Sequence, residues 1–174
     1  MNAVLISIKP KWCKLIAECK KTIEVRKTRP KIDVPFKCYI YCTQEKYKVD
    51  ALRILPNGRV EGWQIERANI LGEYCNGKVI GEFVCDKIDE IGYSPEMHGQ
   101  YISNIENLHE VSCVNFEEMF DYIADGFGFG WHITNLVIYD KPKEVRDFYH
   151  INLDYTNITR IRKAPQSWMY CLDS

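Results

Sequence analysis

Short apolar segments with strand character recur along the chain, and their irregular spacing most constrains its fold. They are rich in β-branched and aromatic residues and span 4–8, 36–43, 77–91, 131–139 and 168–171. Helical patterns begin at Pro10, Asn115 and Pro142, but they do not alternate regularly with the strand-like segments. Because a doubly wound parallel sheet needs such alternation, the sequence predicts an α+β fold with a mixed sheet or barrel.

Two polar or glycine-rich segments interrupt this pattern. Residues 44–77 are expected to form a loop-rich insertion, in which Asn57-Gly58 favours the tight turn of a hairpin. Residues 126–130 alternate glycine with phenylalanine directly after a predicted helix. Nucleotide-binding glycine loops follow a strand, so we interpret 126–130 as a hinge or tight turn.

Composition limits the class of protein. The 174 residues are 46% hydrophobic and 13% aromatic, which excludes intrinsic disorder and predicts one domain over 1–174. No apolar segment is long enough to cross a bilayer, and the first residues lack the pattern of a signal peptide. We therefore expect a cytoplasmic protein with no membrane partner.

The cysteines do not have the spacing of a metal site. There are eight, with no Cys-x-x-Cys pair, and the four histidines also lack paired spacing. We expect reduced thiols packed in the core, no metal and no cofactor, with a metal or redox role as the alternative.

Charge is segregated along the chain although the net charge is only −1. Residues 1–31 contain nine lysines and arginines against two glutamates, whereas residues 82–125 contain one lysine against eleven acids. The basic stretch predicts a phosphate-bearing partner such as RNA. The alternative is two solvated faces of opposite sign that only maintain solubility.

One ordered set of motifs resembles a known family. A strand ending at 7–10 (Ser-Ile-Lys-Pro), a short helix and the Lys-x-x-Glu-x-Arg motif of Lys21, Glu24 and Arg26 resemble the ASCH domain of the PUA-like superfamily. Residues 77–83 resemble the central barrel strand of that family. Its closing strands are similar to 131–134 and 165–168.

The resemblance implies a fold and a class of ligand. The implied fold is a PUA-like mixed β-barrel of about five or six strands with flanking short helices. The implied function is binding of RNA or of a modified nucleobase or nucleoside in a cleft beside the Lys-x-x-Glu-x-Arg motif. A protein partner that uses the acidic segment 82–125 is a third possibility.

The alternation of residues predicts how the motif meets a ligand. Thr22, Glu24 and Arg26 share one strand face, opposite Ile23 and Val25. In a cleft, Glu24 accepts a hydrogen bond from a base amino group, while Arg26 and Lys21 meet carbonyl or phosphate oxygens. The alternative is a structural ion pair that closes one end of the barrel.

Other residues complete the candidate binding set. Trp12 and Trp131 are candidates to stack on a base, although their apolar neighbours also fit a core position. His132 is a weaker candidate for a general base. The predicted ligand-binding residues are Lys9, Trp12, Lys21, Thr22, Glu24, Arg26, Lys27 and Trp131.

An enzymatic alternative also follows from the resemblance. A branch of the superfamily resembles amidohydrolases that deacylate N4-acetylcytidine with a lysine, a threonine and a glutamate. Lys21 matches the lysine and Glu82 matches the glutamate, but Glu24 occupies the position of the threonine. Thr22 offers a hydroxyl one strand repeat away, but a lysine activates such a hydroxyl only when its pKa falls well below its usual ~10.4. The other route is a carboxylate that activates water. For an enzyme the catalytic candidates are therefore Lys21, Glu24 and Glu82, with Thr22 as a further one.

Overall fold

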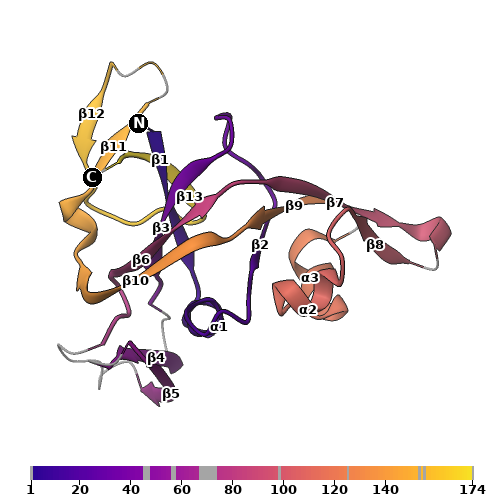
Figure 1. The fold of residues 1–174 in the computed structure, drawn as a ribbon, viewed down its shortest axis with the longest axis horizontal. Helices are drawn as coiled ribbons and strands as arrows, with labels where there is room; N and C mark the ends of the chain where they lie inside the picture. The colour runs from indigo at the N-terminus through magenta and orange to yellow at the C-terminus, as the bar shows by residue number, and fades with distance from the viewer. Residues whose placement is uncertain are drawn as a thin grey trace.

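The computed structural model is mostly β with a few short helices, as expected for an α+β protein (Figure 1). It describes residues 2–44, 48–55, 58–66, 74–97, 99–124, 126–152, 154 and 156–173. No helix among these residues is long and apolar enough to span a membrane.

The largest sheet has seven strands in the order β10-β6-β3-β1-β13-β11-β12. Strands β1 and β3 pair in parallel and the remaining neighbours are antiparallel, so the sheet is mixed as predicted. Its strands are β1 (Asn2–Ile8), β3 (Phe36–Cys42), β6 (Val79–Cys85), β10 (Thr134–Lys143), β11 (Tyr149–Ile151), β12 (Ile158–Arg160) and β13 (Trp168–Leu172).

A four-stranded antiparallel sheet extends away from the first in the order β2-β9-β7-β8 (Figure 1). Helices α2 (Leu108–Ser112) and α3 (Phe116–Ile123) pack beside it, and Asn115 forms with Glu118 the capping box that the sequence predicts for α3. The strands are β2 (Ile23–Arg26), β7 (Ile88–Ser94), β8 (Gln100–Ser103) and β9 (Phe127–His132).

The remaining elements are short. Strands β4 (Lys48–Ile54) and β5 (Val60–Glu66) form the hairpin predicted inside the 44–77 segment, and they pack against α1 (Pro10–Ala17). Residue 57 of the predicted turn lies outside the described residues. Two turns of 3₁₀ helix, η2 (Pro95–Met97) and η3 (Val145–Asp147), precede β8 and β11.

The expected barrel of five or six strands is not what the strands form. The described strands make three open sheets. The edge strands of the first sheet, β10 and β12, do not pair with each other, and β2 pairs with β9 in the second sheet and not with a strand of the first. The predicted strand at 77–91 is divided between β6 and β7, which belong to different sheets. The short helix predicted from Pro142 begins later, because Pro142 and Lys143 are the last two residues of β10 and only the 3₁₀ turn η3 follows before Phe148.

The glycine-rich segment 126–130 is not a turn, because residues 127–130 begin strand β9 and only Gly126 precedes it. Its glycines are needed because the sheet lies close to buried side chains. A Cβ atom on Gly130 would lie 2.4 Å from Cδ1 of Ile105, and one on Gly128 would lie 3.1 Å from Cδ1 of Ile123. Close packing therefore selects glycine here, as it does in other strands that approach a neighbour closely.

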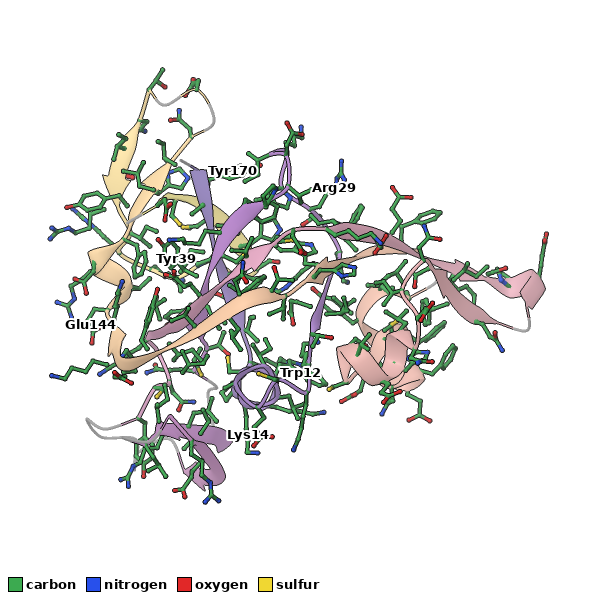
Figure 2. All side chains as sticks on the ribbon, in the orientation of Figure 1. Trp12, Lys14, Arg29, Tyr39, Glu144 and Tyr170 are labelled. Carbon is green, nitrogen blue, oxygen red and sulfur yellow. The ribbon has the colours of Figure 1, made fainter. Side chains whose placement is uncertain are left out.

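Two cores meet near the start of the chain. Strands β1, β3 and β6 bury one apolar cluster, and β2, β7 and the helices α2 and α3 bury another. Trp12 on α1 packs against both clusters (Figure 2). Helix α1 starts at Pro10, which needs no amide donor there, and it buries Cys13 and Ile16. The segment that follows α1 is thereby fixed between the two sheets.

Candidate functional site

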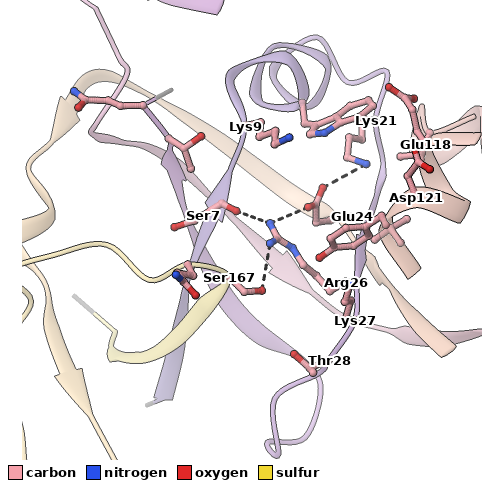
Figure 3. Close-up of a pocket in the computed structure, with 17 residues that line it drawn as sticks. Ser7, Lys9, Lys21, Glu24, Arg26, Lys27, Thr28, Glu118, Asp121 and Ser167 are labelled. Atoms are coloured by element: carbon pink, nitrogen blue, oxygen red, sulfur yellow. Dashed lines mark hydrogen bonds and ion pairs between the residues drawn. The ribbon is translucent and has the colours of Figure 1, made fainter. Parts of the chain in front are cut away.

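A pocket of about 840 Å³ opens beside β2, bordered by the ends of β1 and α1, by α3 and by residues 166–167 (Figure 3). Its charged lining includes Lys9, Lys21, Glu24, Arg26 and Lys27. These are the residues of the predicted Lys-x-x-Glu-x-Arg motif and two of the predicted flanking lysines. The structure therefore brings most of the candidate binding set to one place.

Lys21 is almost completely buried at the wall of this pocket, with 2% of its surface exposed. Its Nζ donates a hydrogen bond to the carbonyl oxygen of Ser112 at 2.6 Å and lies 3.3 Å from Oε2 of Glu24. Burial lowers the pKa of Lys21, and the attraction of Glu24 partly opposes that shift. The ammonium group is held by a carbonyl from α2 and a carboxylate from β2.

Glu24 and Arg26 form the second half of the network. Nη2 of Arg26 lies 2.9 Å from Oε1 of Glu24 and donates to the carbonyl oxygen of Ser7 at 2.6 Å. Nη1 donates to Oγ of Ser167 at 3.4 Å (Figure 3). Strand β1 and the segment before β13 therefore close over the polar face of β2, which leaves Glu24 5% and Arg26 7% exposed.

Two polar atoms in this network have no hydrogen-bond partner among the described residues. They are Oε2 of Glu24, an acceptor that keeps only its ion pair with Lys21 at 3.3 Å, and Nε of Arg26, a donor. A buried donor left without any partner costs about 1–3 kcal/mol, which applies to Nε of Arg26. Both side chains line the pocket, so a ligand that offers a donor beside an acceptor has the chemistry to match them.

Aromatic rings and exposed lysines surround the buried network. Lys21 Nζ lies 5.1 Å from the ring centroid of Trp12, and Lys27 Nζ lies 5.2 Å from that of Tyr122. Tyr122 and Asp121, both on α3, line the pocket but were not among the predicted site residues. Glu118 also lines the pocket, and Asp121 and Tyr122 follow it by three and four residues in α3. This helical spacing is the sequence signal that places the three on one helix face.

Four candidates lie elsewhere. Trp131 is fully buried in the core, where its ring packs against Phe36 and Trp168, so its position is that of a core residue. Thr22 is exposed and does not line the pocket. Two candidates form pairs outside the pocket lining: Glu82 accepts a hydrogen bond from Tyr139, and His132 pairs with Asp89.

The lysine, threonine and glutamate of the amidohydrolase alternative are therefore not assembled. Of Lys21, Thr22 and Glu82, only the lysine lines the pocket. In the part of the chain that the structure describes, no group of three or more His, Cys, Asp or Glu side chains is arranged to hold a metal ion.

Comparison with known proteins identifies the fold. No protein-family model matches the chain, and no curated protein matches it in sequence. Crystal structures of two mutants of the ASCH protein from Zymomonas mobilis are similar to it. The first is 17% identical with a TM-score of 0.55, over 97% of this chain and 88% of that one. The second is 17% identical with a TM-score of 0.51, over 97% and 87%.

The chain has an ASCH-like fold. This confirms the resemblance to the ASCH domain that the motif order indicates, although the described sheets are open and do not close into the expected barrel. A likeness at this identity concerns the ASCH-like fold alone, so the chemistry of the site has to be argued from the residues of this chain.

Proposed function

We propose that the protein binds RNA or a modified nucleobase or nucleoside in the pocket beside Lys21, Glu24 and Arg26. The observation that carries this proposal is the buried charged network at the pocket wall, in which Nε of Arg26 has no partner and Oε2 of Glu24 is held only by an ion pair with Lys21. Burying three ionised side chains is costly, and such groups cluster at functional sites.

These two atoms fit the edge of a nucleobase. An amino or imino N–H of a base donates to Oε2 of Glu24 beside its ion pair with Lys21, and a neighbouring carbonyl oxygen or ring nitrogen accepts from Nε of Arg26. All four common bases present a donor next to an acceptor, and a base modified at that edge changes the match. Trp12 and Tyr122 supply aromatic surface for stacking.

The surroundings of the pocket favour a ligand that also carries phosphates. Lys9 and Lys27 are exposed at the pocket and belong to the basic stretch 1–31. A smaller hollow of about 470 Å³ adjoins the pocket, shares Lys27 with it, and is also lined by Arg29 and Lys31. A nucleic-acid strand whose base occupies the pocket would place its backbone along these cations.

Calorimetric titration of the whole protein tests the proposal. The probes are cytidine, guanosine, N4-acetylcytidine and a single-stranded RNA of roughly ten nucleotides. The variants Lys27→Ala and Tyr122→Ala are compared with Arg146→Ala, a matched control whose exposed side chain belongs to η3.

We expect Lys27→Ala to weaken RNA binding and reduce its salt dependence, because one phosphate contact is lost. Tyr122→Ala should weaken nucleosides and RNA by about 1–3 kcal/mol through lost stacking. Arg146→Ala should bind like the wild type. Equal loss in all three variants, or no binding of any probe, contradicts the proposal. Release of acetate from N4-acetylcytidine would instead support the hydrolase alternative.

A further inference from the structure

Five aromatic rings form a partly exposed cluster where the four-stranded sheet meets helices α2 and α3, separate from the pocket. They are Tyr93 on β7, Tyr101 on β8, His109 on α2 and Phe116 and Phe120 on α3. None of the five lines the pocket, which lies beside Glu118, Asp121 and Tyr122 of the same helix. We refer to the five as the aromatic cluster.

The rings are in continuous contact. Phe116 stacks on Phe120 with 6.2 Å between centroids, and Tyr101 lies 5.4 Å from Phe116. Tyr93 lies 5.5 Å from Tyr101 and 5.8 Å from Phe120. His109 closes the cluster at 6.5 Å from Tyr101 and 6.4 Å from Phe116.

Much of this aromatic surface faces solvent. Phe116 is 41% and Phe120 is 42% exposed, while the same helix buries Met119 and Ile123 in the core below. The core contacts of α3 are therefore made by other residues, and the two phenylalanines are not needed to fill it. Contiguous exposed aromatic surface of this kind marks an interaction site more often than isolated exposed residues do.

The segment that carries the cluster is acidic, and the cations beside it, Lys11 at Glu118 and Lys27 at Tyr122, come from other segments. Residues 93–124 contain six acids and no lysine or arginine. Glu110 follows His109, and Glu117 follows Phe116, and neither glutamate forms an ion pair with any described residue. Glu118, by contrast, is paired with Lys11 at 2.5 Å. The cluster therefore combines aromatic rings with uncompensated carboxylates.

We propose that the aromatic cluster docks an arginine-rich segment of a partner protein. A guanidinium group stacks flat on aromatic rings and pairs with carboxylates at the same time, so arginine matches both features of this surface. The segment 93–124 contributes no lysine or arginine to bind a phosphate, whereas Lys9 and Lys27 are exposed at the pocket. A lysine ammonium group is more strongly hydrated and cannot stack in this way, so it fits the surface less well.

The probes for this proposal are two synthetic peptides of equal length and charge, one an Arg-Gly repeat and the other a Lys-Gly repeat. Binding to the full chain is measured by fluorescence anisotropy at moderate salt. The variants are Phe120→Gln and Glu117→Gln, and melting temperatures confirm that both fold. The matched control is Phe127→Gln, since Phe127 is 75% exposed but packs over Gly92 on the opposite face of the sheet from Tyr93.

The wild type should bind the Arg-Gly peptide about fivefold more tightly than the Lys-Gly peptide, because only arginine stacks. Phe120→Gln should weaken the Arg-Gly peptide about tenfold and remove the preference. Glu117→Gln should weaken both peptides by a smaller factor, and Phe127→Gln and Lys27→Ala should change nothing. Because Lys27→Ala is expected to affect RNA binding at the pocket but not peptide binding at the cluster, the two proposals can fail independently.

Three outcomes overturn the proposal. Equal affinity for the two peptides, or equal affinity in the wild type and Phe120→Gln, shows that only general charge attraction operates. A dimer in sedimentation that Phe120→Gln dissociates shows that a second copy of this chain occupies the cluster. Loss of RNA binding in Phe120→Gln with the peptide unaffected assigns the rings to base stacking.

Discussion

Glu24 and Arg26 stand two residues apart on β2 and form an ion pair of 2.9 Å that is almost completely enclosed. Strand alternation brings the two side chains to the same face. The carbonyl oxygen of Ser7 and the hydroxyl of Ser167, which are far from β2 in sequence, then close over that face. The pair is thus both a part of the fold and a part of the pocket wall.

The first prediction is that Glu24→Gln destabilises the protein. The change leaves Arg26 and Lys21 buried without their carboxylate, and removal of one partner from a buried pair costs about 3–5 kcal/mol. The free energy of unfolding is measured by urea denaturation. Asp121→Asn is the control, because it removes an exposed acid from the same pocket and should change stability by less than about 0.5 kcal/mol. A similarly small change for Glu24→Gln would show that the pair is solvated.

Local sequence patterns were sufficient for the start of the fold. The apolar segment before Pro10 predicts β1, Pro10 predicts the start of α1, and alternation after Lys21 predicts β2. The same alternation correctly separates Ile23 and Val25, which are in the second core, from Glu24 and Arg26. These features depend only on residues that are neighbours in the chain, so a single sequence is enough to predict them.

The features that sequence patterns did not predict depend on contacts between segments that are distant in the chain. The sequence left two alternatives for the polar face of β2, a cleft or a structural ion pair, because the residues that cover this face are not part of the local pattern. The glycines of 126–130 read as a turn, because nothing local indicates that Ile105 and Ile123 press against them in β9. The role of Tyr122 in the pocket likewise depends on how α3 packs against the rest of the chain.

A second prediction concerns Gly81 in β6. A Cβ atom at this position would lie 2.4 Å from the carbonyl oxygen of Val137, a backbone atom that cannot move aside alone. Gly81→Ala should therefore cost about 1–3 kcal/mol of stability. Gly92→Ala is the control, since its Cβ would meet only the exposed ring of Phe127 at 3.2 Å. Equal thermal shifts in the two variants would contradict this explanation.

The third prediction separates the cysteines by reactivity. Cys19 is exposed and Cys113 is partly exposed, whereas the other six are buried. Burial raises the pKa of Cys75 to about 11 and the pKa values of Cys85 and Cys171 to about 12, which suppresses their reactive thiolates. A thiol reagent at neutral pH should label Cys19 and Cys113 in the native protein and all eight cysteines after denaturation. Rapid native labelling of more than these two, or one zinc per chain in elemental analysis, would contradict the prediction.

The last prediction is a pH dependence that originates at Asp89. Burial raises the pKa of this carboxyl group, but hydrogen bonds from Lys87 and His132 outweigh burial and lower it overall. The distances from Oδ2 of Asp89 are 2.9 Å to Nζ of Lys87 and 2.7 Å to Nε2 of His132. A carboxyl group with a lowered pKa in the folded state stabilises the protein above its unfolded pKa of about 3.9. That stability is lost as the pH falls through the lowered value.

Asp89→Asn should therefore lower the free energy of unfolding by about 1.5–3 kcal/mol near neutral pH, the range for hydrogen bonds to charged groups. The gap between wild type and variant should shrink as the pH drops below about 4, because the wild-type carboxylate becomes protonated and loses the same interactions. Asp86→Asn is the matched control, since Asp86 is exposed in the connection just before β7 and should follow the wild type at every pH. Urea denaturation at several pH values measures both variants. A gap that stays constant down to strongly acidic pH would show that the Asp89 charge makes no contribution to stability.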